Sequence, residues 1–326
     1  MKSLDLTRSP FIKDIQKGFL EEGCYLLKMI HMNVGQSSKP FLRLLISDKT
    51  GHLPAVYFGS KKELVDLQKK IKEGDIVKIS GVMEEYNEIL QIKIIKIKKE
   101  ENRDWELSRF FKRTPHDRRN LYRDLRKITD KIKNKDIKDV IGYFFKDKNF
   151  MKLFLEAPAS RFIHHAYIGG LLEHTLHVLQ LAESYGNIFV QADKDLLLAG
   201  AFLHDIGKVD EYKFLLTEID YSSEAKLKGH TLLGYDRLKK AFEKIKIDEK
   251  IKLKLEHIVL SHQGRKNWGA VIEPKFLEAY LIHAADSTDA SQFIFSEVKR
   301  ENAPADLQKR YWSDYISYLG REIYLG

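Results

Sequence analysis

Side chains that bind metals recur across one segment whose apolar pattern is helical from end to end. His204 and Asp205 are adjacent in the run Leu203-His204-Asp205-Ile206-Gly207-Lys208. The whole set comprises His174, His204, Asp205, His230, His257, His262 and Asp286. Most successive members are about two to three dozen residues apart, which is enough for one helix and its return. A helical bundle would therefore let successive helices each carry a polar side chain into a shared core.

The helical period indicates which histidines point into that core. His174 shares a stripe with the apolar residues Leu171 and Val178, whereas His177 lines up with Gln180 on a wetter face. A single inward histidine is usually a hydrogen-bonded core residue. Four or more of them with two aspartates would leave too many buried polar groups without partners, and a divalent metal satisfies them together.

The N-terminal hundred residues have a different pattern, which predicts a small β-barrel. Strands are expected at 25–29, 41–46, 53–58, 75–82 and 90–94, with a helix at 61–72. The alternation slips at Ile95, as a β-bulge would cause. Five strands with a helix after the third describe an OB-fold barrel, and the Asp48-Lys49-Thr50-Gly51 turn between strands resembles OB domains that bind single-stranded nucleic acid. A barrel used only for packing or oligomerisation is the alternative.

A basic helical connector is expected between these parts, and it carries the net charge. Between Lys93 and Lys135, sixteen Lys and Arg residues exceed seven Asp and Glu by nine, which equals the formal charge of +9 for the whole chain. Interleaved aromatic residues favour contact of Arg118, Arg119 and Arg123 with an anionic polymer over a merely solvated helix face.

Three helices are expected in the connector. Thr114-Pro115-His116-Asp117 is typical of a helix start with Thr114 as the N-cap, and that helix should run to about Lys133. Further helices are expected at 136–145 and 149–156. No Gly/Ser-rich linker separates these helices from the second domain, so the connector is expected to pack with it.

Residues 160–290 resemble an HD-domain phosphohydrolase, through His174, the His204-Asp205 doublet and Asp286. The resemblance implies that these four residues hold one metal, and that Asp205 bridges to a second metal held by His230 and His262. His257 lies five residues before His262 and is rotated away from it on one helix, so its role as a ligand is less secure. Gln263 stands where relatives often have a second histidine, which leaves the second ligand set open.

The order of OB module, connector and HD domain resembles the YhaM-type 3′→5′ exoribonucleases across nearly the whole chain. The stretch 163–175 and the tail near Trp312 carry part of that resemblance. The expected fold is α+β multidomain: an OB-fold barrel at 1–100, a basic connector at 101–157 and an all-α HD-type domain at 158–326. The resemblance implies metal-dependent removal of nucleotides from the 3′ end of single-stranded RNA, with single-stranded DNA open as a second substrate.

The expected chemistry is hydrolysis of phosphodiester bonds by a metal-activated water, with two divalent ions bridged by Asp205. Manganese is the favoured metal, with iron, zinc, nickel and cobalt as alternatives. Lys208 is expected to meet a phosphate oxygen. Arg161, His164 and His165 are expected to bind the terminal nucleotide, with structural capping of the turn as an equal alternative.

Asp289 is not one of the expected ligands, but it follows Asp286 by about one helical turn and is expected to orient a ligand imidazole.

Cys24 is the only cysteine, no run approaches transmembrane length, and the N-terminus has no apolar signal segment. These features predict a cytoplasmic protein that needs no membrane, and a homo-oligomer is left open. Two other functions are left open: an HD phosphodiesterase acting on a small or cyclic nucleotide, and a single-strand-binding protein with an inert HD site.

Overall fold

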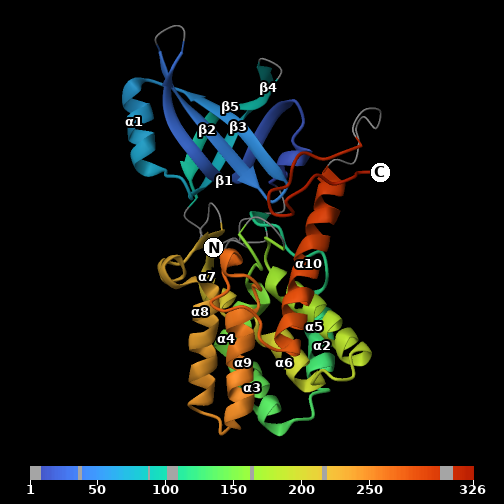
Figure 1. Cartoon of the computed structure of the whole chain (residues 1–326). Coiled ribbons are helices and arrows are strands. Elements are labelled where there is room, and N and C mark those ends of the chain that lie inside the picture. Colours follow the sequence, from blue (N-terminus) through green and yellow to red (C-terminus); the bar gives the residue numbers. More distant parts are fainter. Residues whose placement is uncertain are drawn as a thin grey trace. The chain divides into compact units, whose positions relative to one another are not determined.

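The computed structural model describes residues 9–35, 39–86, 89–100, 109–161, 165–214, 219–301 and 311–326. The chain divides into two compact units, residues 1–112 with 214–220, and residues 113–213 with 221–326 (Figure 1). The β-barrel and the helices have separate hydrophobic cores. Among the described residues, no helix is both long and apolar enough to cross a membrane.

The first unit is built on a closed barrel. Its strands are β1 (Gly18–Val34), β2 (Pro40–Asp48), β3 (Gly51–Phe58), β4 (Ile76–Tyr86) and β5 (Ile89–Lys99), after a short 3₁₀ turn at Ile12–Asp14. They close in the order β1-β2-β3-β5-β4, with only the β3–β5 pair parallel among these strand pairs. Helix α1 (Lys61–Lys70) follows β3 and begins at a capping box of Ser60 and Glu63. The predicted OB-fold topology is confirmed.

The bulge predicted at Ile95 is present in β5. Ser80 pairs with Lys96 and Gly81 pairs with Ile94, so Ile95 is an extra residue on its strand. Glycine is required opposite the bulge, because a Cβ at Gly81 would lie 2.4 Å from a carbonyl oxygen of β5. A slip in apolar alternation was therefore sufficient to locate this irregularity.

The second unit is helical, as predicted. Its helices are α2 (Arg118–Thr129), α3 (Lys135–Lys146), α4 (Lys148–Glu156), α5 (Gly170–Ile188), α6 (Lys194–Leu203), α7 (Lys208–Glu211), α8 (Ser223–Phe242), α9 (Glu249–Ser261) and α10 (Leu277–Glu301). A 3₁₀ turn spans Lys266–Trp268, and the strands β6 (Tyr212–Phe214) and β7 (Ile219–Tyr221), which hold residues of both units, pair with each other. Helix α5 packs against α2, α4, α6 and α10, and α9 packs against α6, α8 and α10. Helix α6 packs against α2, α3, α5, α9 and α10, so α5 and α6 lie at the centre of the helical unit.

The helices predicted at 136–145 and 149–156 are α3 and α4, but the first connector helix differs from its prediction. Its N-cap is Asp117, whose carboxylate accepts a hydrogen bond from the backbone N–H of Arg119 at 2.8 Å, and the helix ends early at Thr129. Thr114 is buried, and its hydroxyl donates to the carboxylate of Glu173. The Thr114 hydroxyl oxygen accepts the backbone N–H of His116 at 3.2 Å, but the helix begins only at Arg118, so Thr114 lies before the helix and is not its cap.

Candidate metal centre and barrel surface

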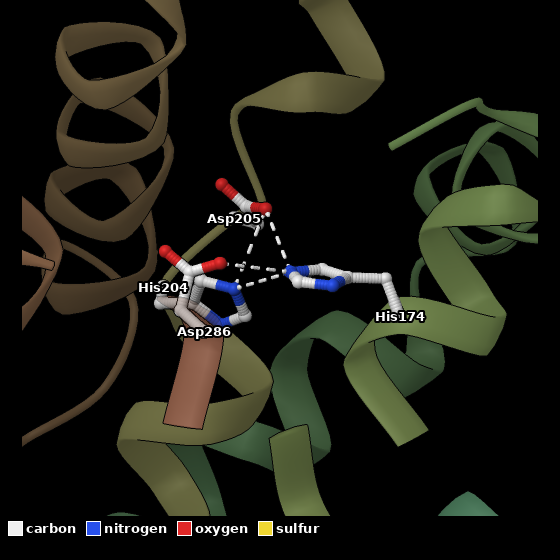
Figure 2. A group of neighbouring side chains, drawn as sticks. All are labelled: His174, His204, Asp205 and Asp286. Carbon is white, nitrogen blue, oxygen red and sulfur yellow. Dashed lines mark hydrogen bonds and ion pairs between the residues drawn. The ribbon is translucent and has the colours of Figure 1, made fainter. Parts of the chain in front are cut away.

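Three helices bring four of the predicted metal ligands into one buried region. His174 lies on α5, His204 is the C-cap of α6, Asp205 follows it, and Asp286 lies on α10. Figure 2 shows these four side chains pointing toward a common point. His174, His204 and Asp205 are at most 1 % exposed. Such polar groups remain this deeply buried only with partners that offset the loss of water.

The first group has the spacing expected around one ion. The His174 Nε2 atom lies 3.2 Å from His204 Nε2, 3.4 Å from Asp205 Oδ2 and 3.3 Å from Asp286 Oδ1. His204 Nε2 lies 3.3 Å from the same Asp205 oxygen. Donor atoms bound about 2.1 Å from a single ion in tetrahedral or octahedral geometry are about 3.0 to 3.4 Å apart. These four residues therefore match one divalent metal.

The second group uses the other carboxylate oxygen of Asp205. Asp205 Oδ1 lies 3.6 Å from His230 Nε2 and 3.4 Å from His262 Nε2, and the two imidazole nitrogens are 3.4 Å apart. His262 is the C-cap of α9, and His230 lies on α8 directly after Gly229, whose φ of 73° breaks the helix. One aspartate thus faces both groups, as a bridging ligand would.

Each of the four imidazoles is held through its Nδ1 atom. The partners are Asp289 for His174 (2.7 Å), Ala201 O for His204 (2.8 Å), Glu211 for His230 (3.0 Å) and Val259 O for His262 (2.7 Å). Carbonyl and carboxylate oxygens only accept, so each Nδ1 carries a proton and Nε2 is the ring atom that is left to bind a metal. All four Nε2 atoms face Asp205, which is the arrangement that metal-binding histidines require.

The charges of the centre also favour a cation. Neither carboxylate oxygen of Asp205 has a hydrogen bond among the described residues, although Lys208 Nζ forms an ion pair with Oδ2 at 2.6 Å. Burial opposes ionisation, yet Lys208 and His204 hold the pKa of Asp205 well below its usual range. Burial likewise acts to lower the pKa of His174, but Asp205, Asp286 and Asp289 raise it well above its usual value. A proton and a metal therefore compete for His174, and the donor set fits two divalent ions bridged by Asp205.

Asp289 supports this centre without facing it. Its carboxylate accepts hydrogen bonds from His174 Nδ1 and His177 Nδ1, both at 2.7 Å, and from His165 Nε2 at 3.0 Å. Burial would raise the pKa of Asp289, but these three imidazoles lower it far below its usual value. The predicted orienting contact with a ligand imidazole is present. His177, predicted on the wetter face, is half-buried and shares this carboxylate.

Several predicted site residues lie elsewhere. His257 is in neither group: its Nε2 accepts the backbone N–H of Lys275 at 3.0 Å, and its ring packs on Phe276. His257 lies five residues before His262 on α9, so its side chain points away from the second group of ligands. The prediction that His257 is a metal ligand is therefore corrected. His165 is buried against Asp289 and Tyr167, which is the structural alternative for this residue.

The remaining predicted residues are cations, apart from His164, which lies outside the described residues. Lys208 is 5 % exposed and lies beside Asp205. The Arg161 guanidinium lies 5.7 Å from the centre of the Tyr221 ring. Arg118, Arg119 and Arg123 are all on α2, where the last two are exposed and pair with neighbouring aspartates.

Two features of the candidate sites were not predicted from the sequence. Glu211 is buried and holds His230, but its place directly before a short strand offers no signal that separates it from a surface glutamate. The second feature is a barrel surface on β2 and β3, where Phe41 and Phe58 are register partners whose rings stack 5.4 Å apart. Lys93 Nζ lies 5.8 Å from the Phe58 ring.

This aromatic pair continues into a row of outward positions on neighbouring strands. Arg43 is exposed on β2, two residues from Phe41, and pairs in register with His31 of β1. Val56 on β3 pairs with Lys93 on β5. We call Phe41, Phe58, Arg43, His31 and Lys93 the barrel platform. The alternation of Phe41 and Arg43 with buried leucines was the available signal, since it places both outside the barrel.

Two family models match separate parts of this chain. The HD domain family matches residues 171–291, and the OB-fold nucleic acid binding domain family matches residues 29–100. Among solved structures, the second OB-fold domain of replication protein A from Methanococcus maripaludis is 18% identical, covering 30% of this chain and 99% of that chain, with a TM-score of 0.24. The SSB domain of a Synechococcus sp. protein is 13% identical, covering 26% and 97%, with a TM-score of 0.22. An HD domain indicates a metal-dependent phosphohydrolase, and with the OB-fold domain it supports a hydrolase that acts on nucleic acid.

Proposed function

We propose that this chain is a cytoplasmic, metal-dependent 3′→5′ exoribonuclease that hydrolyses single-stranded RNA. The observation that carries the proposal is the bridging position of Asp205, whose two oxygens face two separate groups of imidazole nitrogens. Such a centre suits phosphodiester hydrolysis, because both the attacking and the leaving oxygen need charge stabilisation. The direction of degradation and the preference for RNA rest on the resemblance to the YhaM-type enzymes.

In this proposal some side chains bind the metal ions and others hold those ligands in position. His174, His204, Asp205 and Asp286 would hold one ion, and Asp205, His230 and His262 would hold the other. When bound, the two ions would lower the pKa of a water molecule and neutralise phosphoryl oxygens.

Around these ligands, Asp289 and Glu211 fix the rings that they contact. Lys208 places a buried ammonium beside the bridging carboxylate, where it balances charge and is the candidate donor to a phosphoryl oxygen.

Substrate contact is proposed for the barrel platform and the basic face of α2. Stacking on aromatic rings such as Phe41 and Phe58 accepts any base, because every base has a π face, and adjacent cations such as Arg43 and Lys93 suit the backbone. Arg118, Arg119 and Arg123 add positive charge in the helical unit. Manganese is the proposed metal, because the ligands combine imidazole and carboxylate.

The test is a time course on RNA labelled at its 5′ or 3′ end, with Mn²⁺ or with EDTA, in full-length protein. We expect 5′-labelled RNA to shorten stepwise and 3′-labelled RNA to release its label first, both only with metal. Asp205→Asn should abolish cleavage and keep single-strand binding, whereas Asp139→Asn, at an exposed site on α3, should change neither cleavage nor binding.

Two results would overturn the proposal. Intact RNA with hydrolysis of cyclic or free nucleotides would make this a small-nucleotide phosphodiesterase. Tight single-strand binding without cleavage under any divalent metal would make it a binding protein.

A further inference from the structure

Gln263 lies at the second group of ligands, where its side-chain amide contacts both imidazoles. Its Nε2 atom lies 3.0 Å from His262 Nε2 and 3.3 Å from His230 Nε2. These are the two ring nitrogens that face Asp205 Oδ1. The amide nitrogen therefore contacts the same two ring atoms that a metal in this position would bind.

An amide is chemically suited to stand in for a cation here. It carries two N–H donors on one side and a carbonyl acceptor on the other, so it can partner an imidazole nitrogen that bears either a lone pair or a proton. The Nδ1 atoms of His230 and His262 are already held by Glu211 and the Val259 carbonyl. With Gln263 in place, both rings have partners at each nitrogen without any ion.

A positive charge at the second metal position would still stabilise the bridging carboxylate of Asp205. Asp205 Oδ1 is buried and has no hydrogen bond among the residues that the structure describes. An ion there would meet that oxygen, two imidazoles and, after rotation of the amide, the carbonyl oxygen of Gln263. The first group offers an additional carboxylate, Asp286. The second position thus carries less negative charge and must displace existing hydrogen bonds.

We propose that Gln263 makes the second metal position a weaker, exchangeable site, so that the centre holds one ion tightly and gains the other only when divalent metal is plentiful. The inference deepens the proposed function, since it rests on a two-metal centre. An amide oxygen in the ligand set also favours Mn²⁺ over Zn²⁺ at this position, because zinc prefers nitrogen and sulfur ligands.

The experiment is a Mn²⁺ titration of full-length, metal-depleted protein, followed by the electron paramagnetic resonance signal of free Mn²⁺ and without RNA. For the native sequence we expect two classes of site, the weaker with a dissociation constant at least about tenfold higher. Gln263→Glu removes the competing N–H donors and adds a carboxylate, so it should tighten the weaker class by about tenfold or more. Gln180→Glu, at an exposed position of α5, makes the same change in charge away from the centre and should leave both classes unchanged.

A second variant separates the proposal from a general charge effect. Gln263→His should tighten Zn²⁺ binding at the weaker site more than Mn²⁺ binding, which competition between the two metals would measure. Two equal sites in the native protein, or equal effects of Gln263→Glu and Gln180→Glu, would overturn the inference. Because no RNA is present, a failure of the exonuclease proposal would leave these binding results intact, and the reverse also holds.

Discussion

At the scale of single residues, the centre depends on how each imidazole is oriented. The adjacency of His204 and Asp205 and the inward face of His174 could be predicted, because sequence position and helical period determine them. Of the groups that fix the rings, Asp289 was predicted from its place one turn after Asp286, but the others could not be. Glu211 reaches His230 only once α7 and α8 pack together. The carbonyls that hold His204 and His262 belong to the backbone, which every residue has, so no residue type in the sequence indicates them.

Asp289→Asn should weaken metal binding although residue 289 faces neither ion. An asparagine can still accept a hydrogen bond, but it loses the charge that holds His174, His177 and His165. Loss of such a supporting carboxylate typically lowers metal affinity by about 10- to 100-fold. Isothermal titration with Mn²⁺ would measure this, with Asp139→Asn as the control on an exposed carboxylate. An unchanged affinity in a folded variant would show that Asp289 serves only packing.

At the scale of elements, periodicity predicted most of the fold. The strands and the bulge at Ile95 follow from alternation, and the inserted helix follows from its helical period. The start of α2 could not be predicted, because Thr114 and Asp117 are both good caps. In the structure the Thr114 hydroxyl accepts the N–H of His116, before the helix, and only Asp117 accepts an N–H of the first helical turn. His257 was included as a ligand although its helical phase already argued against it.

Gly207 determines how closely the turn after Asp205 approaches α8. A Cβ at position 207 would lie 2.0 Å from the carbonyl oxygen of His230 and 2.4 Å from the backbone nitrogen of Gly234. Gly207→Ala should therefore push α8 away, lowering the free energy of unfolding by about 1–3 kcal/mol and weakening metal binding through His230. Urea denaturation and Mn²⁺ titration would measure the two effects.

Gly142 on α3 provides the matched control for that substitution. A Cβ there would meet no atom within 4 Å, and its backbone is helical. Gly142→Ala should stabilise the protein by about 0.5–1 kcal/mol, because alanine loses less conformational freedom in a helix. Similar destabilisation by both substitutions would contradict the role assigned to Gly207.

At the scale of the whole molecule, the barrel and the helical unit are assigned different tasks. The order of the two folds could be read from the switch between a period of two and a helical period. Alternation places Phe41 and Arg43 of the barrel platform outside the barrel, but the Phe41–Phe58 stack could not be predicted, since it depends on the register between β2 and β3. A strand register is set by the whole barrel and not by either strand alone.

Phe58→Ala should weaken binding of single-stranded RNA while leaving the metal centre unaffected. Base stacking on an aromatic side chain contributes about 1–3 kcal/mol, which corresponds to roughly 5- to 150-fold in the dissociation constant. Fluorescence anisotropy with a labelled oligonucleotide and EDTA would measure binding without cleavage. Phe19→Ala removes another exposed aromatic ring from the barrel, outside the platform, and should have little effect. Equal losses in the two variants would remove the platform from the proposal.

The basic face of α2 should contribute through charge alone. Replacing Arg118, Arg119 and Arg123 by glutamine would remove three cations, of which Arg119 is 92 % exposed. If they contact phosphates, each loss should reduce the slope of log affinity against log salt by about 0.7, the value for single strands. Anisotropy at several salt concentrations would measure that slope, and replacing Lys61, Lys62 and Lys69 of α1 gives a control with the same change in charge. A weaker affinity with an unchanged slope would mean that these arginines stabilise the fold, whereas a flatter slope specific to α2 would make the helical unit a second contact for the RNA backbone.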